Sequence, residues 1–318
     1  MRIVLVSVIL SINLLASAKT YYVSTTGKDT NPGTILNPWL TWNYAFNHAI
    51  AGDTVYFRGG VYYALESQGN SDGPVGTAAN PVCFFNYPNE VPILDGINKK
   101  TMDYGVSFNN AKYVNIKGLV ARNHFQLETS HDLAGFGFTF CNNIRVERCL
   151  AHHIGVRGFY FYECDEIDVI NCDAYNCIDT LSNGAHGDGY LVWDLHSTNL
   201  DTTYRVSFRG CRAWNCADDG WDAETEGLIE LDSCWAFISD ADFGYGINGF
   251  KLGNIDIPSN NLGKRITNCI AAFEPAAGFV TNDNDRPAKR MLIYIHAKRN
   301  FQETFENLDN ENLLEEGG

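Results

Sequence analysis

Five glycine-aromatic pairs recur through the middle of the chain at an almost constant spacing. Their glycines are separated by 31, 31, 29 and 29 residues, and each pair follows a hydrophobic segment, a cysteine and a few turn residues. A period of this length is typical of a solenoid, in which every coil buries its apolar face against the next coil. We therefore expect residues at equivalent repeat positions to form columns along a stack. The pairs are Gly158-Phe159, Gly189-Tyr190, Gly220-Trp221, Gly249-Phe250 and Gly278-Phe279.

Short hydrophobic segments at one repeat position indicate aligned β-strands. We expect these strands at 144–147, 167–170, 204–208, 228–231 and 265–267. The resulting coil of about 23 residues, expanded by loops such as 181–186 and 194–203, fits an all-β parallel β-helix. A β-propeller is the main alternative, but its blades run to ~40 residues and its strands are antiparallel. The observed spacing is too short for a propeller.

The N-terminal segment has the pattern of a secretory signal peptide. Residues 1–18 contain one basic residue, an apolar run from Ile3 to Leu15 and the small-residue ending Ala16-Ser17-Ala18. We expect cleavage after Ala18, which places the protein in the periplasm or outside the cell. A signal anchor is the alternative, but the apolar run is shorter than the ~20 residues that a membrane-spanning helix needs. We expect no membrane span in the rest of the chain.

The expected β-helix domain covers residues 19–290, and its first part, about 19–63, is expected to be a cap. Apolar residues at helical spacing in segment 40–50 predict a short helix there. Such a helix would cover strand edges that an open end of the stack leaves unpaired. The segment 291–296 is a candidate for one more strand, whereas 291–318 as a whole departs from the repeat.

The charge of the chain limits its partners. A formal net charge of −15 argues against nucleic acid, because the phosphates would be repelled. An anionic substrate would need a local source of positive charge. The continuous repeat favours one elongated domain, which we expect to be a monomer.

Ten cysteines in a secreted chain would ordinarily suggest disulfides. Their spacing favours another interpretation, because five of them end a strand at the same repeat position. We expect an inward column of free thiols that pack as small apolar residues, with disulfides between neighbouring coils as the alternative. The five are Cys149, Cys172, Cys211, Cys234 and Cys269.

Position in the repeat also predicts a cluster of charged residues. Asp188 and Asp219 both directly precede the repeated glycine on successive coils, so their α-carbons should lie about 4.8 Å apart. Asp222 and Lys251 both lie two residues after that glycine, again on successive coils. Together with Asp218, these residues should form one patch. That patch is the candidate site.

Carboxylates gathered on one rigid face repel each other unless a cation lies among them, and hard oxygen ligands suit Ca²⁺. The alternative is that the Asp-Asp-Gly sequence at 218–220 is only a turn, since these residues are common in turns. The additional acids Asp188 and Asp222, at matched repeat positions, favour the calcium site.

Lys251 lies where it could act as a general base. A nearby cation favours the neutral form of lysine, whereas neighbouring carboxylates favour the charged form, and the sequence does not give the balance. Calcium beside a basic lysine suits β-elimination from a uronic acid, in which the lysine takes the C5 proton and the bond to O4 breaks. An acidic protein would then bind an acidic polymer through a bridging metal.

At these residues the chain resembles the pectate lyases of polysaccharide lyase family 9. The matching segments are Gly187-Asp188-Gly189-Tyr190, Ala217-Asp218-Asp219-Gly220-Trp221-Asp222 and Gly249-Phe250-Lys251-Leu252-Gly253. The resemblance implies a right-handed parallel β-helix that cleaves pectate. It also implies that Asp188, Asp218, Asp219 and Asp222 match the calcium ligands of the family, and that Lys251 matches its Brønsted base. The chain departs from the family near Asn284, where relatives continue with further regular coils.

Other interpretations are kept open. A β-helix hydrolase could use Asp218 or Asp219 as general acid and another aspartate as base, although this leaves Lys251 without a task. A lyase for rhamnogalacturonan and a non-catalytic glycan-binding β-helix are further alternatives. Arg157 and Arg286 could hold substrate carboxylates, but solvated or ion-paired arginines are the more economical interpretation.

Overall fold

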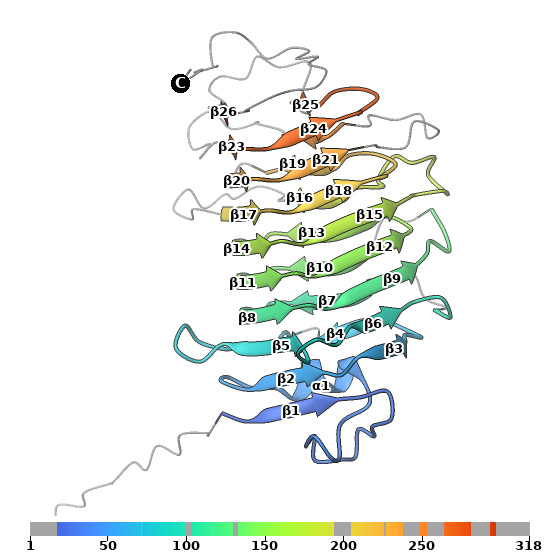
Figure 1. Cartoon of the computed structure of the whole chain (residues 1–318), viewed down its shortest axis with the longest axis vertical. Helices are drawn as coiled ribbons and strands as arrows, with labels where there is room; N and C mark the ends of the chain where they lie inside the picture. The colour runs from blue at the N-terminus through green and yellow to red at the C-terminus, as the bar shows by residue number, and fades with distance from the viewer. Residues whose placement is uncertain are drawn as a thin grey trace, which may run out of the picture.

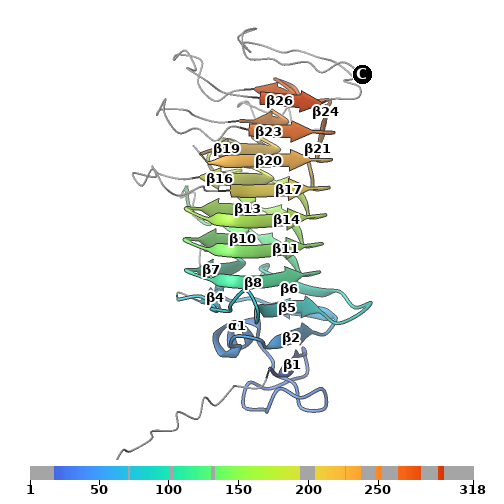
Figure 2. The same ribbon diagram turned by 90° about the vertical axis from the view of Figure 1, so that its left-hand side faces the viewer.

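The computed structural model describes residues 18–70, 72–99, 103–129, 133–193, 205–225, 227–237, 248–252, 264–280 and 293–296. All paired strands run parallel and form three sheets of ten, eight and eight strands. Figures 1 and 2 show these strands stacked along the long axis of the molecule, one coil above another. The predicted parallel β-helix is confirmed, and the alternating order of the sheets along the chain defines each coil.

The three sheets are named A, B and C in the order in which the chain visits them within a coil. Sheet A contains β1 (Thr20–Val23), β2 (Thr54–Phe57), β5 (Val82–Asn86), β8 (Lys112–Lys117), β11 (Asn142–Glu147), β14 (Asp165–Ile170), β17 (Arg205–Arg209), β20 (Leu228–Asp232), β23 (Lys264–Thr267) and β26 (Ile293–His296). Sheet B contains β3 (Gly60–Tyr63), β6 (Pro92–Asp95), β9 (Val120–His124), β12 (Leu150–Ile154), β15 (Asp173–Cys177), β18 (Arg212–Trp214), β21 (Trp235–Phe237) and β24 (Ile270–Ala272). Sheet C contains β4 (Gln68–Asn70), β7 (Val106–Asn109), β10 (Ala134–Thr139), β13 (Arg157–Tyr162), β16 (Tyr190–Trp193), β19 (Trp221–Glu224), β22 (Phe250–Lys251) and β25 (Phe279–Val280).

The predicted strand positions agree with the structure to within two residues at each end. The expected strand at 204–208 is β17, which begins one residue later, and the expected strand at 265–267 lies within β23. The expected strand at 291–296 is β26, which pairs with β23 in parallel register. Residues 1–17 of the expected signal peptide, the loop 194–203 and Arg286 lie outside the described residues. Among those described, no helix is long and apolar enough to cross a membrane.

Aromatic side chains fill the interior as a column, as the repeat predicts. The rings of Tyr190, Trp221 and Phe250 stack with centroids 4.6 and 4.7 Å apart. The column continues to Phe159 on one side, at 5.1 Å, and to Phe279 on the other, at 4.9 Å. All five residues are buried, so Trp221 belongs to the core. Burial of such side chains is the main favourable contribution to folding.

The repeated glycine is required because the coils approach closely at that position. A Cβ atom on Gly220 would lie 2.5 Å from the carbonyl oxygen of Gly249 and 2.9 Å from the Cβ of Ala236. The same two obstacles occur at Gly189, where the distances would be 2.7 Å to both Gly220 O and Ala213 Cβ. Sheet B carries alanine opposite each glycine, so two small residues per coil bring sheets B and C together.

We predict that Gly220→Ala destabilises the protein by about 1–3 kcal/mol, because the added methyl group must displace backbone atoms. Gly278→Ala is the matched control, since its nearest obstacle is Ala271 Cβ at 3.1 Å. Urea denaturation followed by circular dichroism measures both changes. Equal losses of unfolding free energy in the two variants would contradict the steric explanation.

The cysteines form the predicted inward column. All ten are free, and all except Cys83 are buried. Neighbouring coils contact through them, since the backbone N–H of Cys149 lies 3.3 Å from Cys172 Sγ and that of Cys234 lies 3.4 Å from Cys269 Sγ. Burial raises the pKa of Cys172 and Cys234 well above the ordinary value for a thiol. These side chains therefore pack as neutral, small apolar groups.

The single helix of the described residues, α1 (Trp42–His48), covers an edge of the stack at its N-terminal end (Figure 1). Its Trp42 and Phe46 side chains are buried in the core. Its exposed side contacts β4, which is the edge strand of sheet C at the N-terminal end of the stack. Asn43 Oδ1 accepts the N–H of Gly69 at 3.2 Å, and Asn47 Nδ2 donates to Gly69 O at 3.0 Å. The helix thus satisfies backbone groups that an open edge would leave unpaired.

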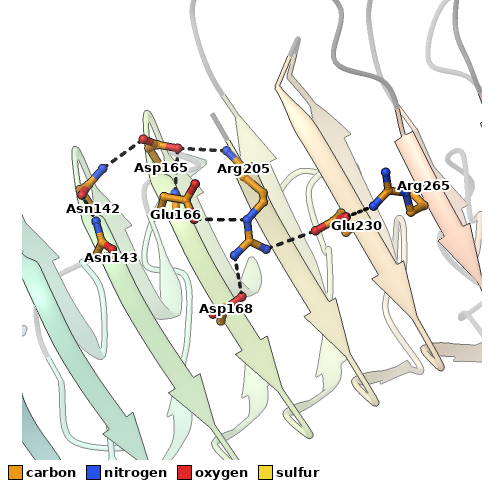
Figure 3. Close-up of polar contacts among 8 residues, drawn as sticks. All are labelled: Asn142, Asn143, Asp165, Glu166, Asp168, Arg205, Glu230 and Arg265. Carbon is orange, nitrogen blue, oxygen red and sulfur yellow. Dashed lines mark hydrogen bonds and ion pairs between the residues drawn. The ribbon is translucent and has the colours of Figure 1, made fainter. Parts of the chain in front are cut away.

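Arg205 is the centre of a charged network on the outer face of sheet A (Figure 3). Its guanidinium contacts Glu166 at 3.2 Å, Asp168 at 3.0 Å and Glu230 at 3.3 Å. Glu230 also pairs with Arg265 on the following coil. Four coils are therefore joined outside the core by charges whose column positions are set by the strand register.

His124, at the end of β9, is a buried titratable group in the interior. A Cβ atom on Gly96 would lie 2.5 Å from its Nδ1, and one on Gly105 would lie 2.7 Å from its Nε2. Burial, together with the positive charge of Lys99, lowers the pKa of His124 to about 3. The imidazole is therefore neutral in the folded protein at all but strongly acidic pH.

We predict that the free energy of unfolding decreases as the pH falls, because buried His124 does not take up a proton. An unfolded histidine has a pKa of about 6.5, so between about pH 6.5 and pH 3 the unfolded chain binds a proton that folded His124 does not. The free energy of unfolding should then fall by up to about 1.4 kcal/mol per pH unit from this residue. A His124→Gln variant should show a shallower loss in denaturation experiments over this window, and His48→Gln is the surface control. An unchanged slope in His124→Gln would refute the assignment.

Candidate metal and catalytic site

Three consecutive coils place the predicted site residues at or near the N-terminal ends of sheet C strands. Asp188 directly precedes Gly189 before β16, Asp218 and Asp219 precede β19, and Lys251 ends β22. Backbone hydrogen bonds fix the spacing, since Gly189 N–H donates to Asp219 O at 3.0 Å. Asp222 and Lys251 are direct partners in the strand register. The register predicted from the repeat is therefore confirmed at these positions.

The five side chains meet in space. Asp188, Asp218 and Asp219 each offer a carboxylate oxygen, and these atoms all lie within 4.8 Å of one another. Lys251 Nζ donates to Asp222 Oδ2 at 2.9 Å and lies 3.3 Å from Asp219 Oδ2. The lysine thus stands between the three-carboxylate group and the fourth acid. The sequence correctly predicted the proximity, while the roles of these residues stay a prediction.

Burial gives these carboxylates unusual electrostatics. It raises the pKa of Asp218 to about 8, with a further contribution from the charge of Asp219. Burial also raises the pKa of Asp188 well above its usual range, and the charges of Asp218 and Asp219 add to this effect. Burial is also the main cause that raises the pKa values of Asp219 and Asp222. Four anions in this space are unfavourable without a compensating positive charge.

Lys251 supplies part of that compensation. Burial acts to lower its pKa, but the charges of Asp219 and Asp222 outweigh burial and raise the pKa above the ordinary value for lysine. The balance that the sequence left open therefore favours the ammonium form when only the side chains are present. Its hydrogen bond to Asp222 holds the ammonium in place.

Two further residues belong to the site, of which the sequence suggested only Arg157, as a contact for substrate carboxylates. Asn248 donates to Asp219 Oδ1 through both its backbone N–H and its Nδ2, each at 2.9 Å. Arg157 is buried, with Nε 4.0 Å from Asp188 Oδ2 and its guanidinium over the ring of Tyr160. Both directly precede the repeated glycine, so the column that contains Asp188 and Asp219 extends to them in either direction. Reading that column through its full length would have found them.

A comparison with known families identifies the fold family. The family model described as "Pel9A-like, right handed beta helix region" matches residues 21–312. The chain belongs to the Pel9A-like right-handed β-helix family. This confirms, at the level of the family, the resemblance drawn from the sequence motifs.

Three curated relatives are named pectate lyases, and two of these are both called pectate lyase L. Pectate lyase L of Dickeya chrysanthemi is 26% identical in an alignment of 297 positions that covers 85% of this chain and 63% of the relative. Pectate lyase PEL9 of Emericella nidulans is 28% identical in an alignment of 305 positions that covers 85% of this chain and 71% of the relative. The Pel9A-like chain thus spans less than two thirds of the length of the Dickeya protein.

Two solved structures share the fold. The structure named rhamnogalacturonan lyase has a TM-score of 0.71 and 24% sequence identity, and covers 88% of this chain and 74% of its own. The structure of pectate lyase Pel9A has a TM-score of 0.70 and 21% sequence identity, and the match covers 93% of this chain and 74% of that structure. At this level of identity the similarity establishes the right-handed β-helix.

The donor atoms of this Pel9A-like site fit calcium. Three carboxylates with oxygens within 4.8 Å of one another offer the hard, anionic ligands that Ca²⁺ prefers. Asp222 adds a buried Oδ1 atom that has no hydrogen-bond partner among the described residues. A buried carboxylate oxygen without a partner is costly, and a cation would satisfy it. Asp188, Asp218 and Asp219 could therefore hold one ion together, and the role of Asp222 as a fourth ligand stays a prediction.

Other histidine, tryptophan and arginine side chains of the sheets have contacts of their own. His152 stacks on Tyr175 on the outside of sheet B, with centroids 4.9 Å apart. Trp214 stacks on the same Tyr175 at 4.5 Å, away from the acidic residues. Trp193 packs against Tyr162 on sheet C at 5.5 Å. Arg157 pairs with a site carboxylate, which agrees with the ion-paired interpretation.

We predict that Asp188→Asn weakens calcium binding by about tenfold or more, because it removes one anionic ligand from the group. Asp168→Asn is the matched control, since Asp168 pairs with Arg205 on sheet A. Isothermal titration with calcium chloride measures both affinities without any substrate. Equal affinity in Asp188→Asn and the parent protein would exclude Asp188 as a ligand.

Proposed function

We propose that this protein is a polysaccharide lyase that cleaves pectate by calcium-assisted β-elimination. The observation that carries the proposal is the position of Lys251, whose Nζ lies between a three-carboxylate group and Asp222. The curated relatives named pectate lyases support the same reaction class. The expected signal peptide would bring the enzyme to an extracellular or periplasmic polymer.

In this proposal Lys251 is the Brønsted base. Its neutral amine takes the proton from C5 of a uronate, the electron pair forms the C4–C5 double bond, and the C4–O4 bond breaks. The departing oxygen takes a proton from solvent, which gives a 4,5-unsaturated product. Calcium, when bound, would supply positive charge for the sugar carboxylate and for the charge that develops on it.

The carboxylates and their neighbours prepare the base. Asp222 holds Lys251 Nζ at 2.9 Å, which fixes the direction of the amine. Asn248 orients Asp219 through two hydrogen bonds to one oxygen, and Arg157 balances Asp188 from the opposite side. Since Asp219 and Asp222 raise the pKa of Lys251, the amine must lose its proton before each elimination.

We predict that Lys251→Met abolishes elimination, with a loss of at least about a hundredfold, because no general base remains. Ultraviolet absorbance of the unsaturated product measures turnover of polygalacturonate with calcium or with a chelator. Lys112→Met, at an exposed position on sheet A, is the control and should retain full activity. Circular dichroism checks that Lys251→Met is folded, and retained turnover in a folded variant would remove Lys251 as the base.

The same assay separates the other interpretations. A hydrolase would release reducing ends without the absorbance, and a non-catalytic glycan-binding protein would release neither. A rhamnogalacturonan backbone is the second substrate in the assay, because the fold alone does not choose between uronate polymers. Elimination on that polymer alone would keep the reaction and correct the substrate.

A further inference from the structure

A second groove lies on a face that the acidic site does not use. It has a volume of about 920 Å³ and runs over the outer side of sheet A and the turns that lead to sheet B. Strands of sheets A and B and the loop between β5 and β6 supply its walls, and no residue of a sheet C strand lines it. The groove is therefore separate from the carboxylates and Lys251, which lie on sheet C.

The groove has an excess of positive charge. Lys117, Arg145 and Arg148 all face one carboxylate, Glu147, at 2.9, 3.3 and 3.8 Å. The side chains of the three cations remain 37%, 47% and 65% exposed, whereas that of Glu147 is 18% exposed. One carboxylate therefore orders three cations while leaving most of their charge available to an anion.

The other two acids of the groove are neutralised from outside it. Arg58, which does not line the groove, binds Glu90 with two hydrogen bonds of 2.8 and 2.7 Å. Arg212, also outside the lining, binds Asp173 at 2.8 and 2.6 Å. Three cations thus stand against one carboxylate in a chain whose net charge is −15.

The backbone at Arg148 shows that this arginine occupies an unusual position. It has a φ of 52°, in the left-handed region that L-residues with long side chains rarely adopt. The equivalent turn residue of the other coils is glycine, asparagine or serine, as in Gly118, Asn171, Gly210, Ser233 and Asn268. Arg148 therefore places a long cationic side chain at a turn where these other coils have only short side chains.

The remaining lining suits a sugar chain. Tyr56 and Phe85 supply ring surface, and Asn89 and Asn115 add amide groups to the lining. The Asn86 amide is used within the loop, where it donates to Tyr87 O and Glu90 O. Further along the same face the charge reverses, since Arg205 is shared by three carboxylates (Figure 3). Positive charge is therefore concentrated at the groove and is not a general property of sheet A.

We propose that this groove is a second, non-catalytic binding site for an acidic polysaccharide, with Lys117, Arg145 and Arg148 contacting its carboxylates. The class of ligand rests on the proposed function, because a uronate polymer is the anion that this protein would meet. Binding here would hold the enzyme on its polymer without entering the reaction. The attraction between exposed charges should weaken as salt is added.

The test is affinity electrophoresis in gels that contain polygalacturonate, with a chelator present and Lys251→Met as the background. The groove variant is Lys117→Gln/Arg145→Gln/Arg148→Gln, and the control is Lys28→Gln/Lys112→Gln/Arg265→Gln, which removes the same charge from exposed positions elsewhere. We expect the groove variant to lose about tenfold in affinity at low salt, as the sum of three exposed charge contacts. The control variant should migrate like the background protein, and all should be unretarded by neutral dextran.

The same groove substitutions are then placed in the active protein. We expect an unchanged turnover rate on short oligogalacturonates, because these cations are not part of the acidic site. Unchanged retardation of the groove variant, or an equal loss in the control variant, would overturn the proposal. Groove-dependent retardation without any elimination would reject the proposed lyase activity and still support the groove. Elimination without groove-dependent retardation would reject the groove as a binding site and still support the lyase activity.

Discussion

The parallel, in-register stacking of coils is the constraint on which the rest of this structure depends. Each strand of sheet C places its residues about 4.8 Å from the same positions of its neighbours. For apolar residues this repetition is favourable, as the stacked rings of Tyr190, Trp221 and Phe250 show. For charged residues it is not, because identical charges in one column repel each other. Charged residues in a column therefore need a positive charge or a hydrogen-bond donor on a neighbouring coil.

The column that precedes the repeated glycine shows this rule. It reads Arg157, Asp188, Asp219 and Asn248, so a cation and a neutral donor flank the two acids. The outward column beside it pairs Asp222 with Lys251. Every acid in these two columns thus has a neighbouring coil that offers a donor or a positive charge. These contacts offset part of the free-energy cost of burying the carboxylates, and a bound cation would offset the rest.

The repeat allowed much of the fold and the site to be predicted, because a fixed period converts sequence position into spatial position. The glycine-aromatic pairs gave the core column, and the same offset gave the contact between Asp222 and Lys251. The sign of the lysine pKa shift was not predictable, since it depends on how burial and two carboxylates sum at one atom. The Arg205 network was also missed, because loops of variable length separate its members and no motif marks them.

The helix α1 shows a different limit. Its existence followed from apolar spacing, but the role of its polar face did not. Asn43 and Asn47 replace a missing strand by satisfying Gly69 on the edge of β4. The sequence around these asparagines reads only as the exposed side of an amphipathic helix. Tertiary contacts of polar side chains are specific to geometry, whereas apolar periodicity follows from burial alone.

The two proposed polysaccharide sites lie on different sheets, and this separation has a consequence for how a long polymer would bind. A chain held in the groove keeps its free segments near the acidic site, so the second contact becomes intramolecular and is set by an effective concentration. The overall negative charge keeps such contacts local, because the polymer is repelled everywhere except at cationic positions. Net charge alone would therefore predict weak binding to an acidic polymer. The distribution of Lys117, Arg145 and Arg148 around one carboxylate is what reverses that expectation.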